Sequence, residues 1–321
     1  MQTRLLICII TFFVISYESK IKAENLRDQI IDLPQDQDTW DNINEPVCGI
    51  DYPPTKYPIV LLHGFMGFDR ALRVEYFYRV VRDYQRKCAM VYTTNVNPLN
   101  TIQRRALELV PQIERILEAT QSEKINIIAH SMGGLDARHL ISNLGFQNRV
   151  ASLTTIGTPH RGTPVPEYVW RYLGKKNFLY KAFEYLIYGA TSTGKRGVNE
   201  ISLNAALWNL TPTYINKFFN PNTPDAPSIY YQSYAGITSL TGLTTGDTVD
   251  PLLMLFQPSF IGYGPNDGLV PVSSAKWGKF RGIVRADHID LIGQVFGTTS
   301  FLFNHRKFYR YILNDLANKG F

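Results

Sequence analysis

Cysteines, long apolar runs and low-complexity tracts are all scarce in this sequence. Its 321 residues include three cysteines, too few for the disulfide framework that holds small domains without a core together. The 33 basic and 27 acidic residues leave a formal net charge of +6. Basic residues are scattered, and short clusters such as Arg104 and Arg105 are typical of solvated helix faces, so we expect no nucleic-acid partner. A hydrophobic content of 45% permits a large core.

The one long apolar run lies at the N-terminus. Arg4 precedes an apolar stretch from Leu5 to Ile15, and polar residues then lead to Ala23, the three-part layout of a secretory signal peptide. The stretch is short for a membrane span, and an uncleaved anchor or a buried helix is the alternative. We expect residues 1–23 to be removed and residues 24–321 to be exported, to the periplasm or medium of a bacterium.

Export would leave two cysteines in the mature chain. Cys8 falls within the predicted signal peptide, so Cys48 and Cys88 remain as an even pair. In an oxidising compartment they can form one disulfide, worth about 4 kcal/mol in the chain-entropy model. Two buried free thiols are the alternative.

Strand-like and helical patterns alternate along the first half of the chain. We expect strands over 57–62, 89–93, 125–129 and 150–157 and helices over 71–86 and 101–119. Pro111 should kink or interrupt the second of these helices. A further strand near 228–235 and a final helix capped by Asn304 follow. The alternation predicts an α/β fold, a mostly parallel central sheet with helices on both faces, in one domain.

Residues 125–134, INIIAHSMGG, carry the most informative local pattern. A β-branched run ends at Ser131, which small residues flank at Ala129, Gly133 and Gly134, and a helical pattern follows. A sharp turn between a strand and a helix needs small neighbours, and it exposes the serine hydroxyl as a nucleophile. The usual first glycine of this motif is alanine here. A serine that merely caps the helix is the alternative.

A nucleophilic serine needs a histidine base and a carboxylate, and α/β-hydrolases carry them in the chain order serine, acid, histidine. Ser131, Asp267 and His288 satisfy that order. Asp267 lies in the turn-rich segment GPNDG, where it can also act as a turn former. His288 follows a predicted edge strand, and a surface histidine is the alternative reading.

The reaction also needs donors for the oxyanion. The backbone N–H of Met132, next to the nucleophile, is one expected donor. The other is the N–H of Phe65, in the turn HGFMG at 63–67 that follows an early strand. The alternative is that the glycines of this turn serve only to make the backbone turn tightly.

Several separated motifs resemble those of the secreted bacterial true lipases of the Pseudomonas, Burkholderia and Proteus type, with the Proteus-like branch closest. They are YPIVLLHGF at 57–65, the serine turn INIIAHSMGG at 125–134, TTIGTPHRG at 154–162, GPNDGLV at 264–270 and DHIDLIGQVFG at 287–297. The resemblance implies the α/β-hydrolase fold and assigns the nucleophile, acid, base and oxyanion donors named above.

The resemblance also implies one structural calcium ion. By motif position its ligands would be the carboxylates of Asp250 and Asp290 and the backbone carbonyls of Gln294 and Thr298, and calcium prefers such oxygen ligands. A helix cap at Asp290 and a turn at Asp250 are the alternatives. The ion would hold the loop that carries His288.

An aromatic-rich insertion runs from about 164 to 211. It is expected to be helical, either as a packed insertion or as a lid whose apolar face covers the active site and meets lipid when open. The implied activity is release of fatty acids from triacylglycerols at a lipid–water interface by a monomer. A phospholipase, a short-chain esterase and a lipid acyltransferase are the alternatives, and dependence on a dedicated folding chaperone is open.

Overall fold

The computed structural model describes residues 28–31, 33, 55–67, 70–71, 74–173, 200–238, 253–294, 296–300 and 302–321. The predicted signal peptide, Cys48, Asp250 and the middle of the aromatic insertion lie outside the described residues. Cys88 is disulfide-bonded, and its partner also lies outside them.

The core of the fold is a six-stranded sheet in the order β4-β1-β5-β6-β7-β8, and every neighbouring pair in it is parallel. A separate pair of short strands, β2 and β3, is antiparallel. The strands are β1 (Ile59–Leu62), β2 (Arg70–Ala71), β3 (Val74–Glu75), β4 (Val91–Thr93), β5 (Ile125–His130), β6 (Val150–Ile156), β7 (Tyr230–Gly236) and β8 (Lys279–Val284). The predicted strands all form.

Helices connect these strands along the chain. The α-helices are α2 (Val80–Arg86), α3 (Ile102–Thr120), α4 (Gly133–Asn143), α5 (Val165–Tyr168), α7 (Glu200–Asn209), α8 (Pro212–Tyr214), α11 (Val272–Ala275) and α12 (His305–Asn318). Single 3₁₀ turns occur at Phe146–Asn148, Asn220–Asn222, Gln257–Phe260 and Asp290–Ile292, and π-helical turns at Val169–Leu173 and Ile215–Phe219. Among the described helices, none has the length and apolarity to cross a bilayer.

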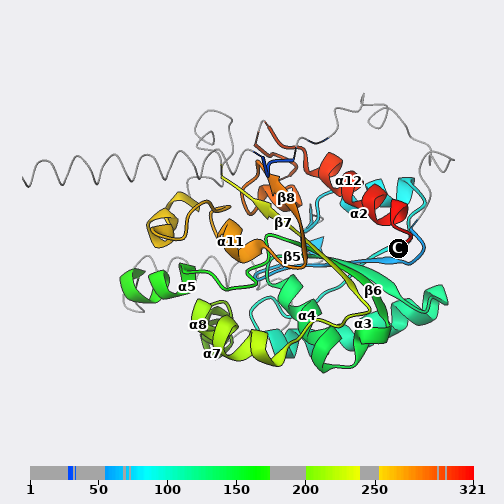
Figure 1. The fold of residues 1–321 in the computed structure, drawn as a ribbon, viewed down its shortest axis with the longest axis horizontal. Coiled ribbons are helices and arrows are strands. Elements are labelled where there is room, and N and C mark those ends of the chain that lie inside the picture. Colours follow the sequence, from blue (N-terminus) through cyan, green and yellow to red (C-terminus); the bar gives the residue numbers. More distant parts are fainter. Residues whose placement is uncertain are drawn as a thin grey trace, which may run out of the picture.

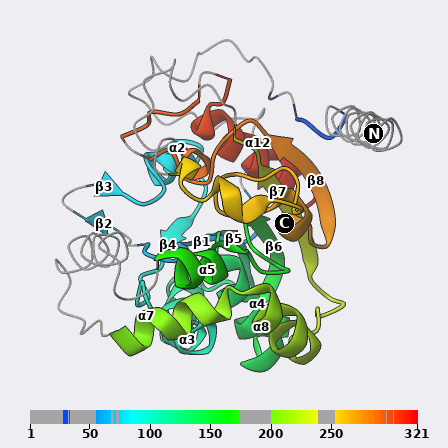
Figure 2. The same cartoon turned by 90° about the vertical axis from the view of Figure 1, so that its left-hand side faces the viewer.

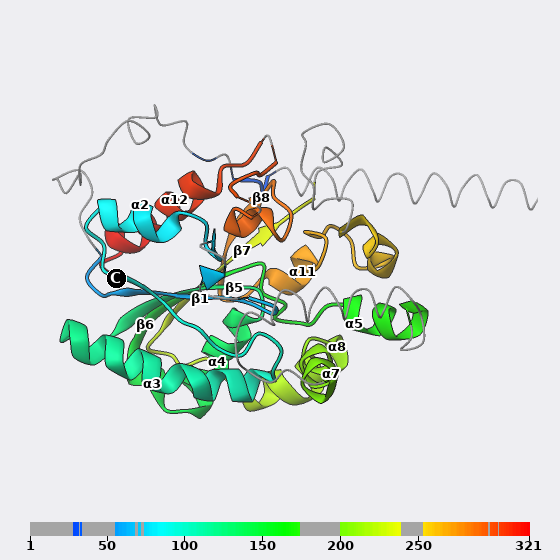
Figure 3. The same ribbon diagram turned by 180° about the vertical axis from the view of Figure 1, so that it is seen from behind.

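Alternate strand residues pack against different helices, which places core on both faces of the sheet. Ile59 and Leu61 share a cluster with residues of α2 and α12, whereas Val60 and Leu62 share one with residues of α3 and α4. Figure 1 and the view from behind in Figure 3 show these two helix pairs on opposite sides of the sheet. The predicted α/β architecture is therefore confirmed.

The prediction of one helix over 71–86 is wrong in its first half. β2 and β3 form a short hairpin there, and α2 begins only at Val80. The consecutive aromatic residues Tyr76 and Phe77 are both buried in the core. Neighbouring side chains on a helix point about 100° apart, so an irregular segment buries this pair better than a helix would.

Of the two effects predicted for Pro111, a kink or an interruption of α3, the interruption does not occur. The helix runs unbroken from Ile102 to Thr120 with the proline inside it. Pro111 is exposed, and so is Leu107, whose carbonyl loses its usual hydrogen-bond partner. Because this face of α3 meets water, solvent can satisfy the carbonyl.

The C-terminal helix closes the face of the sheet that α2 covers. Its N-cap is Asn304, as predicted, with the side chain accepting a hydrogen bond from the N–H of Lys307 at 3.0 Å. Asp83 on α2 forms ion pairs with Arg306 and Arg310 on α12. Burial alone would raise the pKa of Asp83, but the two guanidinium groups outweigh it and hold the pKa below its usual value.

Candidate active site

Ser131 lies at the sharp turn between β5 and α4. Its backbone has a φ of 55°, a left-handed conformation that costs energy for a residue with a side chain. The turn is held by two hydrogen bonds: the N–H of Ser131 donates to the carbonyl of Ile156 at 2.9 Å, and the hydroxyl of Thr158 donates to the carbonyl of Ser131 at 2.8 Å. The N-cap of α4 is Met132, so the alternative of Ser131 as a helix cap is wrong.

The glycines around this turn stand where any side chain would collide. A Cβ atom at Gly64 would lie 2.5 Å from the Cβ and 3.1 Å from the Oγ of Ser131. A Cβ at Gly133 would lie 2.7 Å from the carbonyl oxygen of His63. The loop that contains Gly64 and Phe65 therefore packs directly against the candidate nucleophile.

Asp267 and His288 are hydrogen-bonded to each other. The Nδ1 of His288 lies 2.8 Å from the Oδ2 of Asp267, and both side chains are buried. The other carboxylate oxygen, Oδ1, accepts hydrogen bonds from the N–H groups of Leu269 and Val270 at 3.0 and 2.7 Å. Asp267 is thus a turn former and a partner of the histidine at once, so the two readings from the sequence are compatible.

The aspartate–histidine pair lies beside the serine turn. Gly157 directly follows Ile156, which binds the backbone of Ser131; a Cβ at Gly157 would lie 3.1 Å from the Oδ2 of Asp267 and 3.3 Å from the Nδ1 of His288. His130, the residue before the serine, has its ring centroid 4.5 Å from that of His288. The segments that follow the carboxyl ends of β5, β6 and β8 therefore lie side by side at the site.

Two backbone N–H groups near the serine have no hydrogen-bond acceptor among the described residues. Within the described part of the chain, the N–H groups of Phe65 and Met132 donate to no other group. The residues on either side of Phe65 are hydrogen-bonded: the N–H of Gly64 donates to the hydroxyl of Tyr76 at 3.1 Å, and the N–H of Met66 donates to the carbonyl of Pro98 at 2.9 Å. These are the two N–H groups that the sequence predicts as donors to an oxyanion.

A buried arginine supports this loop, and the sequence reasoning missed it. Arg105 was expected on a solvated helix face, but it is 0% exposed. Its guanidinium forms a 2.8 Å ion pair with Asp136 and donates to the carbonyl oxygens of His63 and Asn97, both at 2.8 Å. Buried arginines are rare, so two adjacent arginines in a predicted helix do not indicate that one of them is buried.

The loop after His288 contains oxygen donors that suit calcium. Asp290 is buried, and its Oδ2 accepts a hydrogen bond from the N–H of Ser300 at 3.0 Å. Gln294 and Thr298 lie on the same loop, whereas Asp250 lies outside the described residues. Among the described residues no three His, Cys, Asp or Glu side chains cluster as a metal site. Carboxylate and carbonyl oxygens are the type of ligand that calcium prefers.

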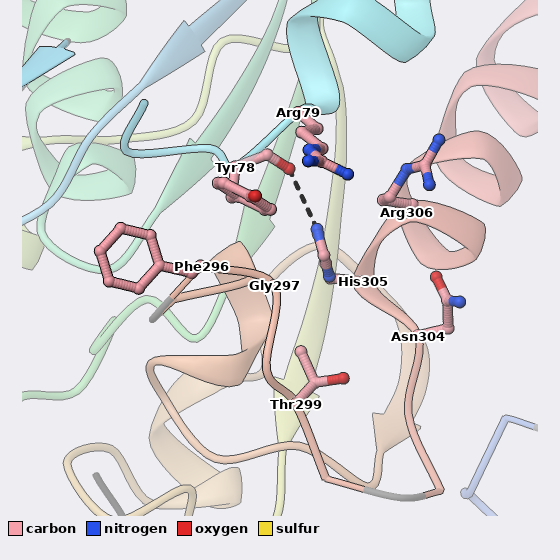
Figure 4. A pocket seen from close by; sticks show the side chains of 8 residues that line it. All are labelled: Tyr78, Arg79, Phe296, Gly297, Thr299, Asn304, His305 and Arg306. Carbon is pink, nitrogen blue, oxygen red and sulfur yellow. Dashed lines mark hydrogen bonds between the residues drawn. The ribbon is translucent and has the colours of Figure 1, made fainter. Parts of the chain in front are cut away.

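This loop lies between Tyr78, which precedes α2, and His305, the first residue of α12 (Figure 4). The Nε2 of His305 donates to the carbonyl of Tyr78 at 3.0 Å. Gly293 and Gly297 leave room for these two residues, since a Cβ would lie 2.3 Å from the His305 ring and 2.8 Å from the Tyr78 ring, respectively. A pocket of about 200 Å³ lies there, lined by Tyr78, Arg79, Phe296, Gly297, Thr299, Asn304, His305 and Arg306.

The described ends of the aromatic insertion reach the oxyanion loop. Leu203 and Leu207 of α7 form a buried cluster with Leu99, and Phe65 and Met66 pack against it. Trp170 joins the same cluster and donates from its indole N–H to the Oδ1 of Asn204 at 3.3 Å. Residues near both ends of the insertion thus belong to the cluster against which Phe65, the predicted oxyanion donor, packs.

The fold and this site define a class of protein. A strained serine turn after a central parallel strand, with an aspartate–histidine pair after later strands, is the arrangement of α/β-fold serine hydrolases. The family model described as alpha/beta hydrolase fold matches residues 57–278. "Triacylglycerol lipase 2" of Saccharomyces cerevisiae is 31% identical over 84% of this chain and 94% of its own length. The "Triacylglycerol lipase" of Vibrio cholerae is 30% identical over 84% and 90%.

This chain therefore belongs to the α/β hydrolase family, among its lipases. The crystal structure of Staphylococcus hyicus lipase matches the fold with a TM-score of 0.58 at 22% identity, covering 84% of this chain and 98% of that one. The mature Bacillus licheniformis lipase BlEst2 matches with a TM-score of 0.60 at 17% identity, covering 83% and 94%. The predicted lipase family is confirmed, and the Proteus-like branch stays a prediction.

Proposed function

We propose that this protein releases fatty acids from triacylglycerols through an acyl-enzyme on Ser131. The observation that carries the proposal is the Asp267–His288 hydrogen bond beside a strained serine and two backbone N–H groups that donate to no other described residue. The names of the Saccharomyces and Vibrio relatives support triacylglycerol as the substrate. The insertion that packs over Phe65 supports a lid, which an esterase of small soluble substrates does not need.

In the proposed reaction, His288 takes the hydroxyl proton of Ser131 as the serine oxygen attacks the acyl carbonyl. Asp267 orients the imidazole and stabilises its charged form through Nδ1. The N–H groups of Phe65 and Met132 bind the oxyanion. His288 then gives its proton to the leaving alcohol, and water attacks the acyl-enzyme with His288 again as the base.

We further propose one structural calcium ion, held by Asp290, by the carbonyls of Gln294 and Thr298, and by Asp250. When bound, the ion would supply two positive charges to the loop that carries His288 and leave the chemistry to the triad. Asp290 lies two residues after His288 in the chain, so its position bears directly on that of the base.

We propose that an apolar surface beside the insertion makes transient contact with lipid. Ile261 is 84% exposed, and further large apolar side chains are exposed nearby in sequence: Met254, Leu255 and Tyr263. Figure 2 places α5, α7 and the segment that contains these residues, drawn in gold, on one side of the molecule. The enzyme would work there as an exported monomer, after loss of residues 1–23.

The test is fatty acid release from emulsified triolein by the mature protein, beside Ser131→Ala and beside a soluble short-chain ester. Release by the parent and none by the variant supports a serine lipase. Cleavage of the short ester alone would replace the lipase by an esterase. Activity of folded Ser131→Ala on either substrate would refute the mechanism, and an acyl ester formed with an added alcohol would favour an acyltransferase.

A further inference from the structure

Two buried polar side chains lie beside the triad and have no role in the reaction as written. Tyr76 follows β3, and His130 is the last residue of β5. Both are buried, His130 almost completely. A buried hydroxyl and a buried imidazole cost free energy unless they are hydrogen-bonded, so their partners indicate what they do.

The hydroxyl of Tyr76 joins the oxyanion loop to the serine strand. It accepts a hydrogen bond from the N–H of Gly64 at 3.1 Å, and it lies 2.8 Å from the Nδ1 of His130. Gly64 directly precedes the predicted oxyanion donor Phe65, and His130 directly precedes Ser131. One hydroxyl therefore bridges the two segments that carry the two donors.

The direction of this chain of hydrogen bonds follows from its donors and acceptors. The Tyr76 hydroxyl oxygen accepts from the N–H of Gly64, so its own proton is available to His130. Burial and the neighbouring His288 hold the pKa of His130 well below its usual value, so this imidazole is neutral. Tyr76 thus donates to the Nδ1 of His130, which leaves the imidazole proton on Nε2.

The ring of His130, where this chain of hydrogen bonds ends, packs against the ring of the candidate base, His288. The ring centroids of His130 and His288 are 4.5 Å apart, and the rings are tilted by 46°. The loop after His288 also returns to Tyr76, because the Nε2 of Gln294 donates to the Tyr76 carbonyl at 3.0 Å. A charged His130 in this place would oppose the positive charge that His288 gains during the reaction.

We propose that Tyr76 and His130 are positioning residues that join the oxyanion loop to the base: the Tyr76 hydroxyl holds Gly64 and His130 by hydrogen bonds, and the ring of His130 packs against that of His288, so that the Phe65 donor and the base are positioned together. This role rests on the proposed serine mechanism. It accounts for the tyrosine hydroxyl, which accepts from one catalytic segment and donates to the other. It also accounts for a second imidazole kept neutral beside the first.

The test compares Tyr76→Phe with Tyr84→Phe on a soluble short-chain ester, which removes lipid binding from the measurement. Tyr84 is a matched control: it is fully buried, and its hydroxyl donates to the carbonyl of Tyr309 at 2.8 Å on the α2–α12 side of the core. We expect Tyr76→Phe to lower kcat about 10- to 100-fold with little change in KM, the usual size of such an indirect effect. Tyr84→Phe should lose thermal stability and keep kcat.

A second variant, His130→Gln, tests whether the two residues act as one chain. The kcat losses of Tyr76→Phe and His130→Gln should then be far from additive in the double variant. An unchanged kcat in Tyr76→Phe, an equal loss in Tyr84→Phe, or additive losses in the double variant would each overturn the proposal. Ser131→Ala in the same assay separates the two failures, because activity in that variant would overturn the serine mechanism itself.

Discussion

Asp267 and His288 are joined twice, once through side chains and once through the backbone. The Oδ2 of Asp267 lies 2.8 Å from the Nδ1 of His288, and the N–H of His288 donates to the carbonyl of Asp267, also at 2.8 Å. The loop of the acid and the loop of the base are thus one hydrogen-bonded unit. The backbone link does not depend on the charge of the carboxylate, which makes the charge separately testable.

Replacing that charge should stop turnover and keep the fold. In Asp267→Asn the backbone bond and the side-chain acceptor for Leu269 and Val270 remain. An amide does not stabilise the charged imidazole and favours the wrong tautomer, so kcat should fall by about four orders of magnitude. Ester kinetics with a melting curve measure both effects, and a variant with more than a tenth of the parent kcat would contradict the assignment of Asp267.

A methyl group at Gly64 should push the oxyanion loop away from the serine. The added Cβ would meet the Cβ of Ser131 at 2.5 Å, closer than real side chains approach. We expect Gly64→Ala to lose at least 100-fold in kcat, the usual effect of losing one oxyanion donor. Gly145→Ala is the control, because it has a φ of 82° and open space around it. It should cost about 1–2 kcal/mol of stability and leave kcat unchanged; equal kcat in both variants would exclude a special role for Gly64.

Acid should destabilise the protein through His305. Burial lowers its pKa to about 4 in the folded state, whereas a histidine in the unfolded chain titrates near ~6.5. Between these two pH values the unfolded state binds one more proton. His305 therefore lowers the free energy of unfolding by about 1.4 kcal/mol per pH unit as the pH falls below ~6.5. Above that pH, the residue adds no pH dependence.

The variant His305→Gln isolates this contribution. Glutamine keeps an N–H donor for the carbonyl of Tyr78 but does not titrate. Denaturant unfolding at pH 7 and pH 5 should show a smaller loss of stability in the variant than in the parent. The same loss in both proteins would show that His305 is not the group that titrates.

Calcium removal should act on stability first and on activity through it. If Asp290 holds the ion, a chelator should lower the melting temperature of the parent, and Asp290→Ala should melt low with or without the chelator. Asp225→Ala is the control, since Asp225 contacts Trp277 and lies outside the His288 loop. It should keep the chelator response. An equal chelator shift in Asp290→Ala and the parent would remove Asp290 from the site.

Sequence patterns predicted correctly those elements whose structure depends mainly on their own residues. The strand runs, the turn at Ser131 and the Asn304 cap belong to this group. The failures are places where packing decides. Tyr76 and Phe77 leave the helical pattern because both are buried, and Pro111 stays inside α3 because its face of the helix meets water.

The same division holds at the site. Chain order and turn motifs were enough to nominate Ser131, Asp267 and His288. Arg105 and Tyr76 carry no local signature, because their partners lie far away in the chain: Tyr76 and His130 are 54 positions apart. Such contacts depend on the finished fold, and a pattern read over a few residues does not contain them.

The position of α12 has a consequence for the order in which this protein can fold. Its residues Phe308, Ile312 and Leu316 cover Ile59 and Leu61 on the first strand of the sheet. During synthesis those strand residues emerge well before α12, because every other strand of the sheet lies between them in the chain. Until α12 emerges, the part of this face that it covers stays apolar and open, and a nascent chain in that state is prone to aggregate.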